Sequence, residues 1–425
     1  MASFNLTNFD AAMKHMYPYK KVENLVYKNN PLLSMIPKET KFPGRNVTYA
    51  VEYGLTTGRS ATFATAQANR GGTKLHDFVV TRVKDYAVVT VDNESMLAAD
   101  GNEGSLLDMA KAKTDSALHA LSRAMGRDVY GSGGGSIGQT GTTVADGGNY
   151  GDTSLELAAG NAINFEVGMR IVFADTDAAA LDSGVLTVTG VDRDGDILTV
   201  DRVANVAVPA LVGAGGDARL IYPEGDRPAG AAAGSIKLSG LDAWLPATVP
   251  AASFFGVTRQ DDSTRLGGQR LAFDGSIQET LINAAVRVSR EGGRPDAIFM
   301  NPVDWAKLAI DLEGRSLVAG AVQTGRRRFG PKDTEAKFGF ASLELASPAG
   351  MVSVYSDHNC PLNLAYMLQM DTWVLKTIGA APRILDFDGL KGVREANNDG
   401  VEYRWGYYGN MLCKSPAYNA RIALL

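Results

Sequence analysis

The segment Ser105–Tyr130, SLLDMAKAKTDSALHALSRAMGRDVY, decides how the rest of the chain can be arranged. Its apolar side chains recur every three or four residues and form one stripe, as on the buried face of a helix. The stripe consists of Leu107, Ala110, Thr114, Leu118, Leu121, Met125 and Val129. Ser105 and Asp108 are typical of an N-terminal cap, and Gly131 is expected to end the helix in a left-handed conformation. The pattern predicts a helix about 37 Å long, either a strut or an ordinary core helix.

The composition is that of a soluble globular protein. The chain has 425 residues, of which 45% are hydrophobic and 21% charged, enough for two or three domains. A formal net charge of −5 gives the whole protein no attraction for nucleic acid or anionic membranes. Two cysteines, Cys360 and Cys413, are too few for a disulfide framework. No signal-peptide core opens the sequence, and no run approaches the roughly 18 apolar residues of a membrane span.

An arm and then a hairpin precede the helix. Residues 1–44 include the proline-pinned stretch NNPLLSMIPKE and cannot form a core, so they must lie along another surface or be disordered. Asn46–Tyr53 alternates as a strand does, and Asp77–Val91 is strand-like over an unusual length. The residues between them are polar and form the predicted tip. Such a ribbon either rests on a neighbouring chain or folds back into its own sheet.

A glycine-rich stretch and a β-rich unit follow the helix. Gly131–Asp152 is interpreted as a flexible linker, and it lacks the Gly-Lys-Ser/Thr of a phosphate loop. From Thr153 to Gly225 short strands alternate with turns. The expected strands include Met169–Ala174, Gly184–Val191, Asp196–Asp201 and Ala218–Tyr222. The aspartates at 192, 194 and 196 predict a hairpin turn rather than a calcium loop, because Gly195 comes fourth where an EF-hand needs its glycine sixth.

The second half predicts an α+β arrangement in which helices cover an open sheet. A capping box, Ser276 to Glu279, opens a helix with one apolar face. That face consists of Ile277, Leu281, Ala284, Ala285 and Val288. The strand Ala297–Met300 runs into a second helix, for which Asn301 is the expected cap, Pro302 the first residue and Asp304 an acid in the first turn. Further strands are expected up to the C-terminus.

No arrangement of residues in the sequence predicts catalysis. The four histidines, His15, His76, His119 and His358, lack the spacing of metal ligands. Asp357–Cys360 contains the residue types of a nucleophilic site, but neighbouring side chains in an extended segment point to opposite faces and cannot converge. No recognised catalytic or nucleotide-binding motif is present. We therefore expect no enzyme activity, no cofactor and no metal.

The strongest run of charge is basic. Arg326, Arg327 and Arg328 stand together, with Arg315 and Lys332 nearby and glycines on both sides. The run is interpreted as a basic loop. It could contact another subunit or a phosphate group, or it could be a solvated loop without a partner.

The order of these parts resembles the tailed-phage major capsid protein family, which has the Hong Kong 97 fold. The segments that carry the resemblance are NNPLLSMIPKE, the hairpin, the helix from Ser105, FFGVTRQDDSTRLGGQRL, PDAIFMNPVDWAKL and the closing WGYYGNMLCKSPAYNARIALL. The resemblance implies an N-terminal arm at 1–44, an E-loop hairpin at 45–92, a P-domain with the spine helix at 93–136, an inserted β-barrel-like domain at 137–235, an A-domain with P-domain elements at its start at 236–375, and a return to the P-domain at 376–425. The closing segment is expected to supply the last P-domain strands.

The resemblance implies a structural coat protein that self-assembles, as pentamers and hexamers, into an icosahedral phage head around double-stranded DNA. It would belong to the virion capsid and assemble in the host cytoplasm. Other partners would be scaffolding, portal and decoration proteins. The DNA would lie on the inner face without sequence-specific contacts, and no membrane partner is expected. The alternatives are an encapsulin-type nanocompartment shell and, in another class, a carbohydrate-active enzyme, for which no paired carboxylates are found.

Inter-subunit contacts are expected from the arm, the hairpin and the polar face of the helix. The arm and hairpin would bury their apolar residues on neighbours, and a neighbour would partly cover Lys113, Ser122 and Arg127. The inserted β unit would project outward. The candidate contact residues are Arg59, Phe63, Arg70, Lys74, Lys113, Arg127, Arg326, Arg327 and Arg328.

Overall fold

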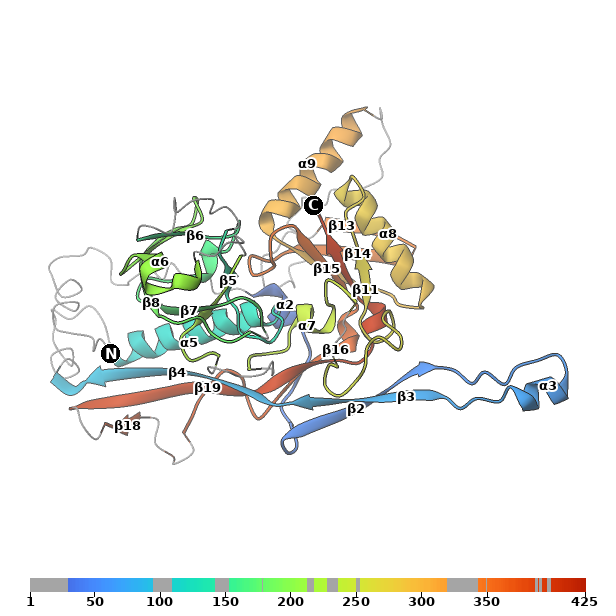
Figure 1. Cartoon of the computed structure of the whole chain (residues 1–425), viewed down its shortest axis with the longest axis horizontal. Coiled ribbons are helices and arrows are strands. Elements are labelled where there is room, and N and C mark those ends of the chain that lie inside the picture. The colour runs from blue at the N-terminus through green and yellow to red at the C-terminus, as the bar shows by residue number, and fades with distance from the viewer. Residues whose placement is uncertain are drawn as a thin grey trace, which may run out of the picture.

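The computed structural model describes residues 30–94, 109–141, 153–177, 179–211, 218–227, 236–249, 253–318, 343–348, 350–386, 389, 392–395 and 399–425. These residues form two open six-stranded sheets, a six-stranded barrel-like unit and a two-stranded ribbon (Figure 1). None of the helices described is long and apolar enough to cross a membrane. The architecture is of the α+β class that the sequence predicts.

The first sheet is organised around β19 (Gly400–Cys413). This strand pairs antiparallel with β4 (Val83–Asp92) along the whole of β4. The other strands are β1 (Lys38–Glu39), β16 (Trp373–Thr377), β17 (Arg383–Ile384) and β18 (Gly392–Arg394). The helix α5 (Met109–Asp128) packs on β4 and β19 and lies along them in Figure 1.

The predicted spine helix is confirmed as α5, but its predicted ending is wrong. Leu121, Met125 and Val129 are buried, so the C-terminal half of the apolar stripe faces the core. Gly131 is not left-handed: the helix tightens instead, and the Gly131 N–H donates to the Asp128 carbonyl at 3.0 Å. The capping pair Ser105 and Asp108 lies outside the described residues.

The second sheet holds the C-terminus. Its strand order is β11-β20-β15-β12-β14-β13. The strands are β11 (Gln269–Leu271), β20 (Ala420–Ala423), β15 (Leu364–Leu368), β12 (Ala297–Met300), β14 (Gly350–Ser356) and β13 (Leu343–Ser347). The closing segment therefore divides: β19 belongs to the first sheet, whereas β20 lies between β11 and β15 in the second. Conversely, β16 pairs with β19 in the first sheet although its first three residues fall within the segment 236–375 predicted to be the A-domain.

Two helices pack against the second sheet, α8 (Ile277–Arg290) and α9 (Pro302–Val318). The predicted apolar face of α8 is buried throughout, and the Asn301 side chain caps α9 by accepting from the Val303 N–H at 3.1 Å. The capping box at α8 is wrong. Ser276 Oγ donates to Asp311 of α9 at 3.1 Å, because a charged acceptor on the neighbouring helix competes with the local cap.

The β-rich unit between residues 137 and 227 closes on itself. Its strand order is β5-β10-β7-β8-β9-β6, and a bridge between Thr140 and Leu157 joins the first strand to the last. The strands are β5 (Gly138–Gln139), β6 (Ser154–Glu156), β7 (Arg170–Ala174), β8 (Leu186–Asp192), β9 (Ile197–Val200) and β10 (Leu220–Pro223), with the short helix α6 (Ala204–Ala207). We call this unit the barrel. It has a hydrophobic core of its own, which includes Phe165, Phe173 and Leu198.

The predicted hairpin turn between β8 and β9 is confirmed. Asp192 Oδ1 accepts from the backbone N–H groups of Asp194 and Gly195, both at 3.1 Å, so this side chain closes the turn. Within the described ranges no cluster of side chains is suited to a metal ion.

The glycine-rich stretch after α5 is not a flexible linker as far as it is described, which is to residue 141. The Gly133 carbonyl accepts from the N–H groups of Ile236 and Lys237 at 3.0 and 3.2 Å. A β-carbon at Gly134 would lie 2.4 Å from the Asp177 carboxylate, so glycine allows close packing here rather than freedom. The chain segments that enter and leave the barrel are thereby hydrogen-bonded to each other.

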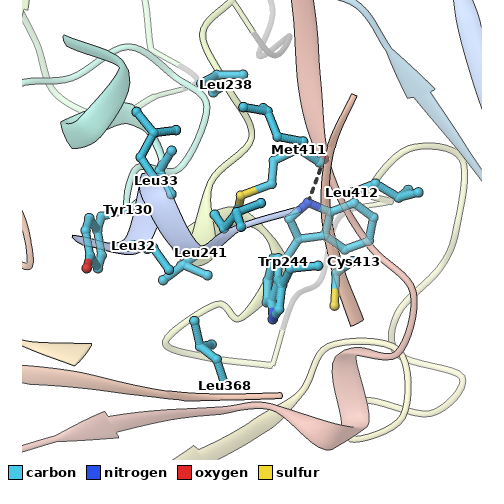
Figure 2. Packing of buried hydrophobic residues seen from close by; sticks show 14 of the residues in the cluster. Leu32, Leu33, Tyr130, Leu238, Leu241, Trp244, Leu368, Met411, Leu412 and Cys413 are labelled. Carbon is cyan, nitrogen blue, oxygen red and sulfur yellow. Dashed lines mark hydrogen bonds between the residues drawn. The ribbon is translucent and has the colours of Figure 1, made fainter. Parts of the chain in front are cut away.

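The two open sheets and the arm share one hydrophobic core (Figure 2). Trp244 of α7 (Leu241–Trp244) is fully buried, and its Nε1 donates to the Met411 carbonyl at 3.2 Å. Leu32 and Leu33 of α2 (Pro31–Met35) pack into the same core. The remaining turns are η1 (Ala162–Asn164), η2 (Pro209–Leu211), η3 (Met370–Thr372) and η4 (Pro416–Tyr418).

Candidate assembly surfaces

The ribbon consists of β2 (Asn46–Gly54) and β3 (Lys74–Thr81), which pair with each other and with no further described strand. The strands run along the body and the tip with α3 extends beyond it in Figure 1, and the ribbon joins no other sheet of the described chain. The single strand predicted over Asp77–Val91 is wrong. The chain changes pairing partner at Arg82. Residues up to Thr81 pair with β2, whose first residue lies opposite Thr81, and residues from Val83 onward pair with β19.

The base of the ribbon is anchored by residues 253–268, part of a segment on which the resemblance rested. The contacts are the Val79 N–H to the Phe255 carbonyl at 2.9 Å, His76 to Asp261 at 2.8 Å, and Arg265 to the Tyr53 carbonyl at 2.8 Å. Arg259 braces this segment from inside by donating to the Ala243 carbonyl at 2.8 Å. Burial lowers the pKa of Arg259 to about 10. The base is therefore fixed to the body.

The tip of the ribbon, residues 55–75, has the opposite character. Leu55, Phe63 and Leu75 are 75%, 83% and 60% exposed, and α3 (Phe63–Ala68) contains no buried residue. Arg59, Arg70 and Lys74 are exposed as well. Four of the predicted contact residues thus lie together on an apolar, cationic tip. The helix α3 was missed, although its alanines and glutamine are good helix formers.

The arm residues described here are held by their own chain, which corrects the expectation that a neighbour buries them. Leu32, Leu33 and Ile36 belong to the shared core. Asn30 donates to the Ser122 carbonyl of α5 at 3.1 Å and accepts from Asn359 at 2.8 Å. A β-carbon at Gly126 would come within 2.6 Å of the Asn30 side chain, so the missing side chain leaves a notch in α5 that Asn30 fills.

The polar cluster Asp357–Cys360 contacts the arm, through Asp357 to the Leu32 N–H at 3.4 Å and through Asn359 to Asn30 at 2.8 Å. Asp357 is 1% exposed and accepts from the Tyr130 hydroxyl at 2.9 Å and from the Asn359 N–H at 2.9 Å. Burial raises the pKa of the Cys360 thiol well above its usual range, which disfavours the thiolate that a nucleophile needs. Sequence reasoning found the cluster but not this role, because Asn30 and Tyr130 are far away in the chain.

The polar face of α5 is covered in part from within the same chain. Arg123 binds Glu166 and the Ile163 carbonyl of the barrel. Arg127, predicted to contact a neighbour, has a side chain only 17% exposed and binds Asp128 at 3.0 Å, which leaves it little surface for another subunit. The side chain of Lys113 and the basic run at 326–328 lie outside the described residues.

A buried ionic joint connects the barrel to the body. Lys237 Nζ lies 2.7 Å from Asp85 of β4 and 3.0 Å from Asp226, where the chain leaves the barrel. The side chains of Lys237 and Asp85 are 7% and 12% exposed. Asp128 stands nearby, and burial raises its pKa. These ion pairs join the end of the barrel to β4.

Neither the family models nor the curated proteins contain a match to this sequence. The capsid asymmetric unit of cyanophage A-1(L) is 12% identical, with 99% of each chain covered and a TM-score of 0.55. The capsid of an empty GTA particle is 9% identical, over 97% of this chain and 95% of that one, with a TM-score of 0.46. The SrpI encapsulin complex of Synechococcus elongatus is 8% identical, over 100% and 96%, with a TM-score of 0.45.

The likeness to the first of these spans both chains almost completely and shows a common fold. This chain has the Hong Kong 97-like capsid fold. The solved structure that carries this conclusion is the cyanophage A-1(L) capsid subunit. The other two similarities lie below a TM-score of 0.5 and add nothing to it.

Proposed function

We propose that this chain is a structural shell subunit, the major capsid protein of a tailed bacteriophage. Copies would assemble into an icosahedral head around double-stranded DNA. The observation that carries the proposal is the whole-chain likeness in fold to a phage capsid subunit. The role is architectural: each copy supplies surfaces to its neighbours, and many interfaces of ordinary size add up to a stable shell.

The ribbon supports this proposal independently of the fold likeness. A two-stranded ribbon is marginally stable in water, and this one leaves Leu55, Phe63 and Leu75 exposed at its far end. Large apolar side chains exposed at the end of an extended ribbon are candidates for burial on a partner. A second subunit that covers the tip would bury these side chains and hold the strands together.

The finer parts of the proposal concern partners and place. Subunits would form pentamers and hexamers of a virion capsid assembled in the host cytoplasm, with scaffolding, portal and decoration proteins as further partners. The barrel is proposed to be an inserted domain on the outer surface. The basic run at 326–328 is proposed to meet symmetry-related copies at the axis of each pentamer or hexamer.

Imaging of the purified protein tests the proposal. The chain should form closed, icosahedral particles in electron cryo-microscopy, alone or with a scaffolding protein, and light scattering should report masses of many subunits. Protein that stays monomeric under all these conditions would contradict a shell function.

The contents of the particles separate this proposal from an encapsulin-type nanocompartment. Particles isolated from the native source should contain double-stranded DNA, which nuclease treatment of opened particles would reveal. Mass spectrometry that instead finds a packaged enzyme and no DNA would favour the nanocompartment.

A further inference from the structure

The charged residues at the tip of the ribbon are all positive. Residues 55–75 contain Arg59, Arg70 and Lys74 and no acidic residue. The same stretch contains Phe63 and Leu55, which are 83% and 75% exposed. No described residue outside the ribbon covers α3, since none of its side chains is buried. A partner for the tip must therefore offer negative charge together with some apolar surface.

The barrel has the complementary character. Residues 153–227 contain twelve acidic and five basic residues, a net charge of −7, whereas the whole chain carries −5. The rest of the protein is therefore slightly positive, and the negative charge is concentrated in this unit. Val167 and Val206 on the barrel are 67% and 77% exposed, so apolar surface accompanies the charge.

The two surfaces are placed for contact between copies rather than within one. In Figure 1 the tip of the ribbon lies at one end of the long axis and the barrel lies toward the other. Two complementary surfaces at different places on one subunit can make a head-to-tail interface, which repeats from copy to copy and closes into a ring where the rotation permits. The ion pairs of Lys237 with Asp85 and Asp226 attach the barrel to β4 of the same chain.

We propose that the cationic tip of one copy docks on the acidic barrel of the next copy. This inference rests on the proposed shell function and names the surface that receives the ribbon. Opposite charges would steer the approach and set the register, while Phe63, Leu55 and the exposed valines would supply buried apolar area.

Paired charge reversals test the docking. The variant Arg59→Glu, Arg70→Glu, Lys74→Glu should lower the yield of particles at least about tenfold by sedimentation, because like charges then face each other. Adding Asp175→Lys, Asp194→Lys and Glu224→Lys on the barrel should restore most of the yield. The matched control adds Asp92→Lys, Glu344→Lys and Asp371→Lys, three exposed acids outside the barrel, and should restore nothing.

A second measurement does not depend on how these variants fold. A photoreactive phenylalanine analogue at position 63 changes neither charge nor shape greatly, and illumination of assembled particles joins it to whatever covers it. Mass spectrometry should find crosslinked peptides from residues 153–227 of another copy. Crosslinks only to other segments, or rescue by the control reversals, would overturn the docking proposal. An unmodified chain that forms no particles would instead overturn the proposed function.

Discussion

Gly126 leaves the space in which the Asn30 side chain of the arm packs against α5. Glycine within a helix normally costs about 1 kcal/mol relative to alanine, so Gly126→Ala would ordinarily stabilise the protein. Here the added β-carbon would come within 2.6 Å of the Asn30 side chain. Asn30 must then leave Ser122 and Asn359, and two hydrogen bonds worth about 1 kcal/mol each are lost. The steric conflict therefore makes Gly126→Ala destabilising, where a glycine-to-alanine change within a helix normally stabilises.

We therefore expect Gly126→Ala to lower the free energy of unfolding of the unassembled subunit by about 1 kcal/mol, the surplus of the lost bonds over the helical gain. Thermal unfolding and limited proteolysis near residues 30–36 measure the effect. The double variant with Asn30→Gly is the control, because it removes the clash and should regain part of the loss. A stabilised single variant would mean that Asn30 does not need the notch.

Lys237 offers a comparison between a buried and an exposed ion pair. Lys237→Met leaves Asp85 and Asp226, whose side chains are 12% and 24% exposed, without their cation, and the loss should approach the roughly 3–5 kcal/mol of a broken buried pair. The control is Arg170→Met, which breaks a pair with Glu224 whose side chains are 59% and 42% exposed. That change should cost under about 1 kcal/mol. Equal losses of thermal stability in the two variants would contradict the account of the joint.

Asp128 gives the joint a dependence on pH. Its Oδ1 accepts from Arg127 at 3.0 Å, whereas its buried Oδ2 has no partner in the part of the chain described. Burial raises its pKa, so the folded state holds the proton more tightly than the unfolded chain does. Its contribution to stability is therefore complete below the ordinary pKa of about 3.9 and declines as the pH rises through the raised folded value.

Asp128→Asn keeps an oxygen for Arg127 and removes the ionisation. We expect a gain in stability at pH 7 of about 1.4 kcal/mol for each unit by which burial raises the pKa, and no gain near pH 4. Thermal unfolding across this pH range measures it. Asp115→Asn, at an exposed position on the same helix, changes the formal charge equally and should show no comparable gain. A gain that is independent of pH would contradict the assignment.

At the scale of elements, helices and strands that depend on the pattern within one segment were predicted correctly. Features that depend on a partner distant in the sequence were not. The apolar stripe of α5, the buried face of α8 and the strand β12 follow from local periodicity. The break of the long strand at Arg82 depends on β19, more than 300 residues away, and could not be read from the alternation. Likewise the capping box at Ser276 fails because Ser276 hydrogen-bonds to Asp311 on another helix.

The candidate surfaces follow the same division. The exposure of the tip follows from the sequence, since large apolar side chains are few in this segment, with Leu55, Phe63 and Leu75 as the exceptions. The arm was assigned to a neighbour because its leucines could have been buried on any surface. The burial of Leu32 and Leu33, and the contacts of Asn30 with Ser122 and of the Leu32 N–H with Asp357, show that its own chain receives it.

The ribbon allows a test in which assembly and folding separate. Deleting residues 58–72 removes α3 and most of the exposed tip but leaves the anchored base with Phe78 and Val80 buried. The subunit should therefore remain folded, with an unchanged circular dichroism spectrum apart from the loss of one short helix. Closed shells should not form, and electron micrographs should show no particles. Normal particles from this variant would show that the tip is dispensable.

At the scale of the whole molecule, the separation of charge predicts a dependence on salt. Attraction between a cationic tip and an acidic barrel is screened once the Debye length falls to about 3 Å at 1 M salt. The initial rate of assembly, followed by light scattering, should fall by about tenfold or more between 0.05 M and 0.5 M salt. A tip with Arg59, Arg70 and Lys74 changed to glutamine should assemble slowly at both concentrations. Acceleration by salt would indicate an interface that is mainly apolar.

The change of partner at Arg82 has a mechanical consequence. Because β3 and β4 follow each other along the long axis with one residue between them, a pull on the tip passes directly into β4 (Figure 1). The hydrogen bonds between antiparallel strands run perpendicular to the strands, so this pull loads the ladder from Val83 to Asp92 in shear. Bonds loaded side by side share the force and must break together. A pull on the tip is therefore carried along the ribbon and β4, and the pairing of β4 with β19 resists it.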